Sequence, residues 1–192
     1  MDALVKSAIA HWAPRFVANG VALTDFEEVT AGVASWNDWC GAWSARAAQH
    51  EAMGREALVN DKLISAGEHL QRAGVYYHFG KFLFVHDIAQ MKAAHMKAVE
   101  CRTLALPHLN PPGERVTIPY QGKALYGILR KPNGVARPPV LVMAVGLDSA
   151  KEETEAYERP YLDRGIATLV FDGPGRARAS MISLFAVTTR SS

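Results

Sequence analysis

The chain has 192 residues, a formal net charge of +2, and 49% hydrophobic against 21% charged residues. This composition is ordinary for a globular protein, and the charge forms no basic stripe of the kind that nucleic-acid-binding domains carry. No apolar stretch approaches the roughly 20 residues that a membrane span needs. Asp2 and Lys6 interrupt the first residues, so no signal peptide is predicted. We expect a cytoplasmic protein that binds neither nucleic acid nor membranes.

Helical periodicity dominates the first hundred residues. Apolar residues recur at helical spacing from Trp36 to about residue 60, and Ser35 with Asp38 three positions later is typical of a helix start. Two more helices are predicted near residues 62–79 and 87–103. Several prolines at positions 107–112 then end the helical region, because proline cannot continue a helix. We predict a helical N-terminal cap domain over residues 1–110.

The period of the pattern changes after residue 113. Segments 114–120 and 124–130 alternate apolar and polar residues around a turn at 121–123, which predicts a β-hairpin. Two continuous apolar runs follow, at 139–145 and 165–172, with a helical segment between them. This arrangement indicates a βαβ unit in a parallel sheet. The predicted fold is α/β, with the first strands of an incomplete α/β-hydrolase sheet over residues 111–175 and an unpaired hydrophobic edge at 169–171.

Several unrelated motifs together carry a family resemblance. They are Ser65-Ala-Gly-Glu-His-Leu70, the aromatic stretch at 76–84, Arg115-Val-Thr-Ile-Pro-Tyr120, Gly146-Leu-Asp-Ser149 followed by Lys151-Glu-Glu153, and Phe171-Asp-Gly-Pro-Gly175. Over residues 25–175 the chain resembles the 2,6-dihydroxypseudooxynicotine hydrolase group of α/β-hydrolases. The resemblance implies a homodimeric serine hydrolase with a helical cap and no cofactor. Such an enzyme cleaves a carbon–carbon bond next to a ketone in an aromatic or pyridine substrate, and relatives of similar sequence are expected to include esterases.

The resemblance also implies where a substrate would bind. The loop after the first parallel strand normally supplies a backbone amide to the oxyanion hole, and that loop contains Gly146 and Leu147. Aromatic and imidazole side chains of the helical domain are candidates to orient the substrate: Tyr77, His78, Phe79 and Phe82. The alternative interpretation of these side chains is a packed helical interface.

The catalytic triad of the family is missing from the sequence. An α/β-hydrolase carries its nucleophile in a G-x-S-x-G motif on a strand-to-helix turn later than the two parallel strands predicted here, with the acid and histidine later still, and the sequence contains no such motif. Ala177 and Ala179 stand where this family is expected to have glycine and serine. We interpret residues 176–192 as an unmatched tail produced by a frameshift or premature stop near codon 176, and expect no activity from the chain alone.

Other residues and functions were weighed against this interpretation. Ser149 has the wrong spacing from Gly146 for a nucleophile, so we expect it to cap the next helix. Asp172 is expected to stabilise its own turn, and Cys40 and Cys101 to be buried free thiols, with no metal site. Two alternatives remain open, one half of a two-chain hydrolase and a helical protein-interaction module. The second lacks the repeat near 34 residues that tetratricopeptide proteins show.

Overall fold

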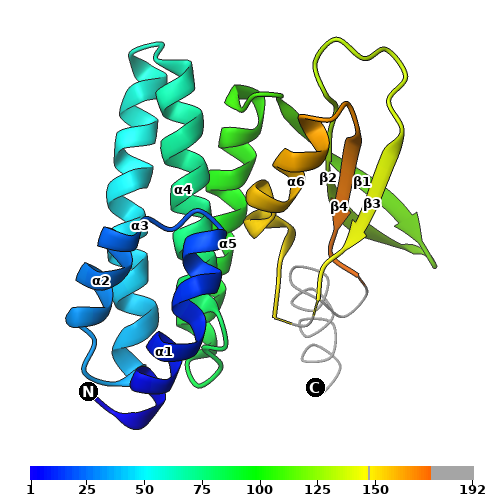
Figure 1. The fold of residues 1–192 in the computed structure, drawn as a ribbon. Helices are drawn as coiled ribbons and strands as arrows, with labels where there is room; N and C mark the ends of the chain where they lie inside the picture. The colour runs from blue at the N-terminus through cyan, green and yellow to red at the C-terminus, as the bar shows by residue number, and fades with distance from the viewer. Residues whose placement is uncertain (147, 174–192) are drawn as a thin grey trace, which may run out of the picture. The chain divides into compact units, whose positions relative to one another are not determined.

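The computed structural model describes residues 1–146 and 148–173. The chain separates into two compact units, one spanning Met1–Asn110 and the other beginning at Pro111. The first unit is helical and the second contains the sheet (Figure 1). The predicted fold class, a helical domain followed by part of an α/β sheet, is confirmed.

Long helices make up the first unit. In chain order they are α1 (Ala3–Ala18), α2 (Leu23–Ala31), α3 (Trp36–Val59), α4 (Leu63–Lys81) and α5 (Ile88–Ala105), followed by the short 3-10 helix η1 (Leu106–His108). Figure 1 shows α3, α4 and α5 as neighbouring long helices. The three helices predicted from periodicity are confirmed within two residues at each end, whereas α1 and α2 were not predicted individually. None of the helices among the described residues combines the length and the apolar character needed to cross a membrane.

Two helix starts share one capping residue. Asp2 accepts a hydrogen bond from Val5 N at the start of α1, and its other oxygen accepts one from Trp36 N at the start of α3, both at 2.8 Å. Ser35 and Asp38 form the predicted capping box, in which Ser35 N donates to Asp38 Oδ2 at 2.9 Å. These bonds satisfy backbone amides that have no partner within a helix.

The core of the helical unit is aromatic. Phe16 stacks on Phe79 with 3.8 Å between ring centroids, and its ring lies 5.3 Å from that of Trp43. All three side chains are fully buried. Cys40 and Cys101 are buried free thiols, as predicted. This unit is therefore stabilised by apolar burial between α1, α3 and α4.

The second unit contains a mixed sheet. Its strands are β1 (Gly113–Tyr120), β2 (Lys123–Arg130), β3 (Val140–Ala144) and β4 (Ala167–Phe171), and the chain between β3 and β4 forms the 3-10 helix η2 (Lys151–Glu153) and helix α6 (Glu155–Leu162). The strand order among the described residues is β1-β2-β4-β3. The hairpin β1–β2 is antiparallel and β3 runs parallel to β4, with Val140 opposite Ala167. Both predicted motifs, the hairpin and the βαβ unit, are confirmed.

One prediction about this sheet is wrong. β4 does not form an edge, because β2 pairs with it antiparallel on the side away from β3. The edges among the described residues are β1 and β3, and at β3 Val140 and Val142 are 53% and 58% exposed. Alternation and hydrophobicity identify a strand but not its neighbours, so the return of the hairpin to β4 could not be inferred.

Candidate functional site

The loop predicted to polarise a substrate carbonyl begins where the two parallel strands end. The carboxyl ends of parallel strands lie at one edge of a sheet, where α/β proteins bind their ligands. Val145, directly after β3, donates its backbone N–H to the carbonyl oxygen of Phe171, the last residue of β4, at 3.4 Å. Gly146 follows at this edge, and Leu147 lies outside the described residues.

Among the described residues, none crowds the α-carbon of Gly146. The residue is exposed, and a Cβ added to it would meet no described atom within 4 Å. The described side chains around Gly146 therefore do not require a glycine here. The assignment of Gly146 and Leu147 to an oxyanion hole stays a prediction.

Asp172 holds the far end of the same loop. Its Oδ1 accepts a hydrogen bond from the backbone N–H of Lys151 at 3.1 Å, and its Oδ2 forms an ion pair with Lys151 Nζ. Lys151 Nζ also lies 2.8 Å from Glu152 Oε1. These three residues are at most 2% exposed. Burial raises the pKa of Asp172, Lys151 opposes that rise, and the negative charge of Glu152 adds to it.

Two expectations concern residues of this region. Ala150, one residue after Ser149, occupies the N-cap position of η2, and the capping role predicted for Ser149 stays a prediction. Asp172 binds a residue 21 positions away, and the turn it was expected to stabilise continues into residues outside the described part. The importance of Lys151 was missed, although it belongs to the Lys-Glu-Glu motif used for the family resemblance.

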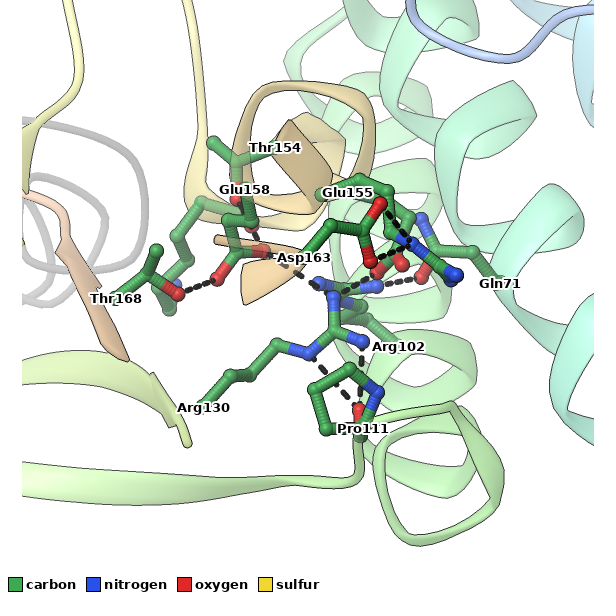
Figure 2. A network of polar contacts seen from close by, with 11 residues as sticks. Gln71, Arg102, Pro111, Arg130, Thr154, Glu155, Glu158, Asp163 and Thr168 are labelled. Atoms are coloured by element: carbon green, nitrogen blue, oxygen red, sulfur yellow. Dashed lines mark hydrogen bonds and ion pairs between the residues drawn. The ribbon is translucent and has the colours of Figure 1, made fainter. Parts of the chain in front are cut away.

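A buried arginine attaches α6 to the sheet (Figure 2). Arg130, at the end of β2, donates two hydrogen bonds to the carbonyl oxygen of Pro111, at 3.2 and 2.6 Å, and forms an ion pair with Glu155 at 2.5 Å. Glu158 lies beside it and accepts a hydrogen bond from Thr168 Oγ1 of β4 at 2.8 Å. Polar contacts therefore set the position of the helix between β3 and β4.

The first candidate side chain of the helical unit, Tyr77, belongs to a polar cluster. Its hydroxyl donates a hydrogen bond to Glu51 Oε2 at 2.9 Å, and Glu51 Oε1 accepts hydrogen bonds from Lys97 and Arg55. Burial and the Glu51 carboxylate raise the pKa of Tyr77 well above its usual value. Tyr77 is thus a neutral hydrogen-bond donor that helps to join α3 to α4.

The other three candidates lie among aromatic rings. Phe79 stacks on Phe16, Phe82 meets the ring of Trp12 edge-on at 4.9 Å, and the His78 ring lies 5.2 Å from that of Phe79. All three candidates are buried. The contacts of Phe79 and Phe82 fit the packing interpretation of these side chains, and their role in substrate binding stays a prediction.

A second polar cluster in the helical unit was not predicted. Asp25 Oδ2 accepts a hydrogen bond from Tyr76 Oη at 2.6 Å and lies 3.2 Å from His50 Nε2, while His50 Nδ1 lies 3.2 Å from His69 Nδ1. Burial lowers the pKa of His50 despite the nearby carboxylate. Within the described residues, no group of three or more His, Cys, Asp or Glu side chains is suited to hold a metal ion.

Most of the sequence matches one protein family. The family described as Esterase FrsA-like matches residues 20–191. The chain belongs to this family. It is 32% identical, over 169 residues, to the 2,6-dihydropseudooxynicotine hydrolase of Paenarthrobacter nicotinovorans, a match that covers 84% of this chain and 43% of that protein. It is 33% identical over 149 residues to the Hydrolyase poxO of Penicillium oxalicum, covering 72% and 34% of the two chains.

Solved structures show the same relationship. The crystal structure of the 2,6-dihydroxy-pseudo-oxynicotine hydrolase matches with a TM-score of 0.78 and 26% identity, covering 94% of this chain and 54% of that one. AbyA5 shares the fold, with a TM-score of 0.55 and 22% identity over 97% of this chain and 50% of that one. As the coverages of 43% and 34% show, the FrsA-like chain spans less than half the length of the two curated relatives. The predicted family resemblance is confirmed.

Proposed function

We propose that this chain is the carbonyl-binding portion of an FrsA-like hydrolase. The reaction proposed for the whole enzyme is the hydrolysis of a carbon–carbon bond next to a ketone, or of an ester, in a small aromatic or pyridine substrate. The supporting observation is the exposed backbone at Gly146, located where the parallel strands β3 and β4 end. The name of the Paenarthrobacter nicotinovorans relative supports the substrate class.

The proposed mechanism assigns one chemical task to this loop. A serine oxygen, whose proton passes to histidine, attacks the substrate carbonyl carbon. The negative charge that develops on the carbonyl oxygen is stabilised by a backbone N–H of the loop at Gly146 and Leu147 and by the N–H of the residue after the nucleophile. The carbon–carbon or ester bond then breaks, histidine gives a proton to the leaving group, and water hydrolyses the acyl-enzyme. One oxyanion donor contributes about 3 kcal/mol to such a reaction. In this proposal the chain supplies the loop donor, but neither the G-x-S-x-G nucleophile nor the second donor, which belongs to the residue after that nucleophile.

The first test concerns the chain alone. We expect no burst of product from an activated aryl ester and no covalent labelling by a serine-directed fluorophosphonate, because no elbow serine is available to be acylated. Intact-mass spectrometry measures the labelling. One label per chain would contradict this part of the proposal, and loss of that label in Ser149→Ala would identify the serine at the loop as its site.

The second test concerns the loop in a complete hydrolase. A chimera joins this chain to the remainder of the Paenarthrobacter nicotinovorans relative, and Leu147→Pro removes one backbone N–H while Leu147→Ala keeps it. We expect kcat to fall about 10²–10³-fold in the proline variant and to stay near that of the parent chimera in the alanine variant. Thermal unfolding checks that both variants fold. Equal kcat values in two folded variants would reject the oxyanion role of Leu147.

A two-chain hydrolase is a second candidate, favoured by the exposed edge at β3. Val140 and Val142 leave a strand edge available for pairing with another strand. In this version, a separate polypeptide supplies serine, acid and histidine. Co-expression with the reading frame directly downstream tests it. Copurification with ester hydrolysis is the expected result, and a downstream frame without G-x-S-x-G would exclude it.

A further inference from the structure

The connection that follows β3 is attached at both of its ends to consecutive residues at the end of β4. At its start, Val145 N donates to the carbonyl oxygen of Phe171 at 3.4 Å. At its far end, Lys151 N donates to Asp172 Oδ1 at 3.1 Å. Two consecutive residues at the end of β4, Phe171 and Asp172, therefore hold both ends of this connection.

Asp172 is unusually well placed for the second attachment. One carboxylate binds both the backbone N–H and the side-chain ammonium of Lys151, so it restricts the backbone and the side chain of the same residue. An asparagine at this position would keep an acceptor for the N–H but would lose the ion pair. The attachment therefore depends on the charge of the side chain as well as on its shape.

Further buried charged side chains connect Lys151 to β1. Glu152 Oε1 lies 2.8 Å from Lys151 Nζ and 3.8 Å from a guanidinium nitrogen of Arg115 on β1. The cluster of Arg115, Lys151, Glu152 and Asp172 thus contains two cationic and two anionic side chains. Burying ions costs free energy even when they are paired, and such pairs are better suited to fix a conformation than to add stability.

We propose that Asp172 is a positioning residue for the hydrolysis proposed above, which holds Lys151 and thereby orients the backbone at Gly146 toward the substrate carbonyl. The catalytic role of Asp172 rests on that proposed function, whereas its bonds to Lys151 do not depend on it. Donors that are already oriented need no reorganisation as charge develops on the carbonyl oxygen, which is why a rigid connection helps the reaction.

Hydrogen exchange of the chain itself tests the attachment. We expect Asp172→Ala to raise the exchange rates of the Ser149, Ala150 and Lys151 amides about tenfold, the effect of losing one or two hydrogen bonds. Asp172→Asn should give a smaller rise because its amide oxygen still accepts the Lys151 N–H. The control is Asp163→Asn, which changes an exposed carboxylate paired with Arg159. Unchanged exchange in Asp172→Ala, or a rise spread equally over β1 and β2, would overturn the proposal.

A titration of the unaltered chain gives a readout that a general packing role would not produce. The Asp172 carboxyl is followed by carbon-13 NMR while amide exchange, corrected for its intrinsic pH dependence, is measured in parallel. Protonation of Asp172 removes the ion pair with Lys151, so exchange at residues 149–151 should rise with the same midpoint as the carboxyl signal. Amide exchange rates at residues 149–151 that do not change with this midpoint would overturn the proposal. Because this experiment uses the unaltered chain, it also works if Asp172→Ala does not fold.

The outcomes separate this inference from the proposed function. The exchange experiments use no substrate, so an inactive chimera leaves them unaffected. Conversely, normal exchange in Asp172→Ala rejects the positioning role, while the Leu147 variants still test the hydrolase proposal.

Discussion

The two units of this chain differ in the largest cluster of their interiors, although both bury ionisable side chains, such as Arg102 and His95 in the helical unit. In the helical unit, a contiguous cluster of apolar and aromatic side chains extends from Val5 to Cys101. In the sheet unit, fully buried side chains include Arg130, Lys151 and Glu158. Apolar burial is non-directional and mainly adds stability, whereas buried ion pairs have defined geometry. We therefore infer that the aromatic cluster mainly stabilises the helical unit and that the buried ion pairs of the sheet unit hold its loops in place.

The largest expected loss of stability follows from removing Trp43, at the centre of the aromatic cluster. Trp43 is fully buried and its ring lies within 6.0 Å of those of Phe16, Phe26, Trp39 and Tyr76. Trp43→Ala should lower the free energy of unfolding by about 4 kcal/mol, measured by urea denaturation. The control Trp36→Ala removes a partly buried tryptophan and should cost far less. Equal losses would show that the cluster does not dominate the stability of this unit.

A smaller loss is expected from the buried arginine of the sheet unit. Arg130→Met removes the buried guanidinium that pairs with Glu155 and lies 3.9 Å from Glu158, and it should cost about 3 kcal/mol in unfolding free energy. Arg159→Met breaks an exposed pair with Asp163 and should cost about 0–1 kcal/mol. If the two substitutions were equivalent, the polar interior of the sheet unit would not have the structural role inferred from it.

The smallest expected effect concerns pH and the histidine cluster of the helical unit. Burial lowers the pKa of His50, so the unfolded chain binds a proton more readily than the folded one. Stability should therefore fall as pH decreases through about 6.5, the ordinary histidine value. Thermal unfolding from pH 8 to pH 5 measures this trend. His50→Gln should flatten it, whereas His11→Gln, at an exposed position, should not.

Local patterns in the sequence predicted most elements but few of their contacts. Spacing after Trp36 predicted α3, and alternation around Gly122 predicted the hairpin, because both signals depend on neighbouring residues. The α1 helix was not predicted as a separate element, and it contains Pro14. The pairing of β2 with β4 depends on segments about 40 positions apart, which periodicity does not report.

The candidate site shows the same limit. Gly146 could be placed after a parallel strand from sequence alone, and the structure puts it there. The bond between Asp172 and Lys151 joins residues separated by 21 positions, so no local motif could indicate it. A buried ion pair of this kind becomes visible only when the ends of two strands are brought together.

The shared cap at Asp2 has a consequence for the order of folding. The Asp2 carboxylate accepts hydrogen bonds from free backbone amides at the starts of two helices, and Trp36, which begins the second of them, lies 34 positions from Asp2 in the chain. The opening turn of α3 therefore gains one of its hydrogen bonds only after α1 has docked. Truncation of the first few residues should fray α3 at its beginning, far from the cut in sequence.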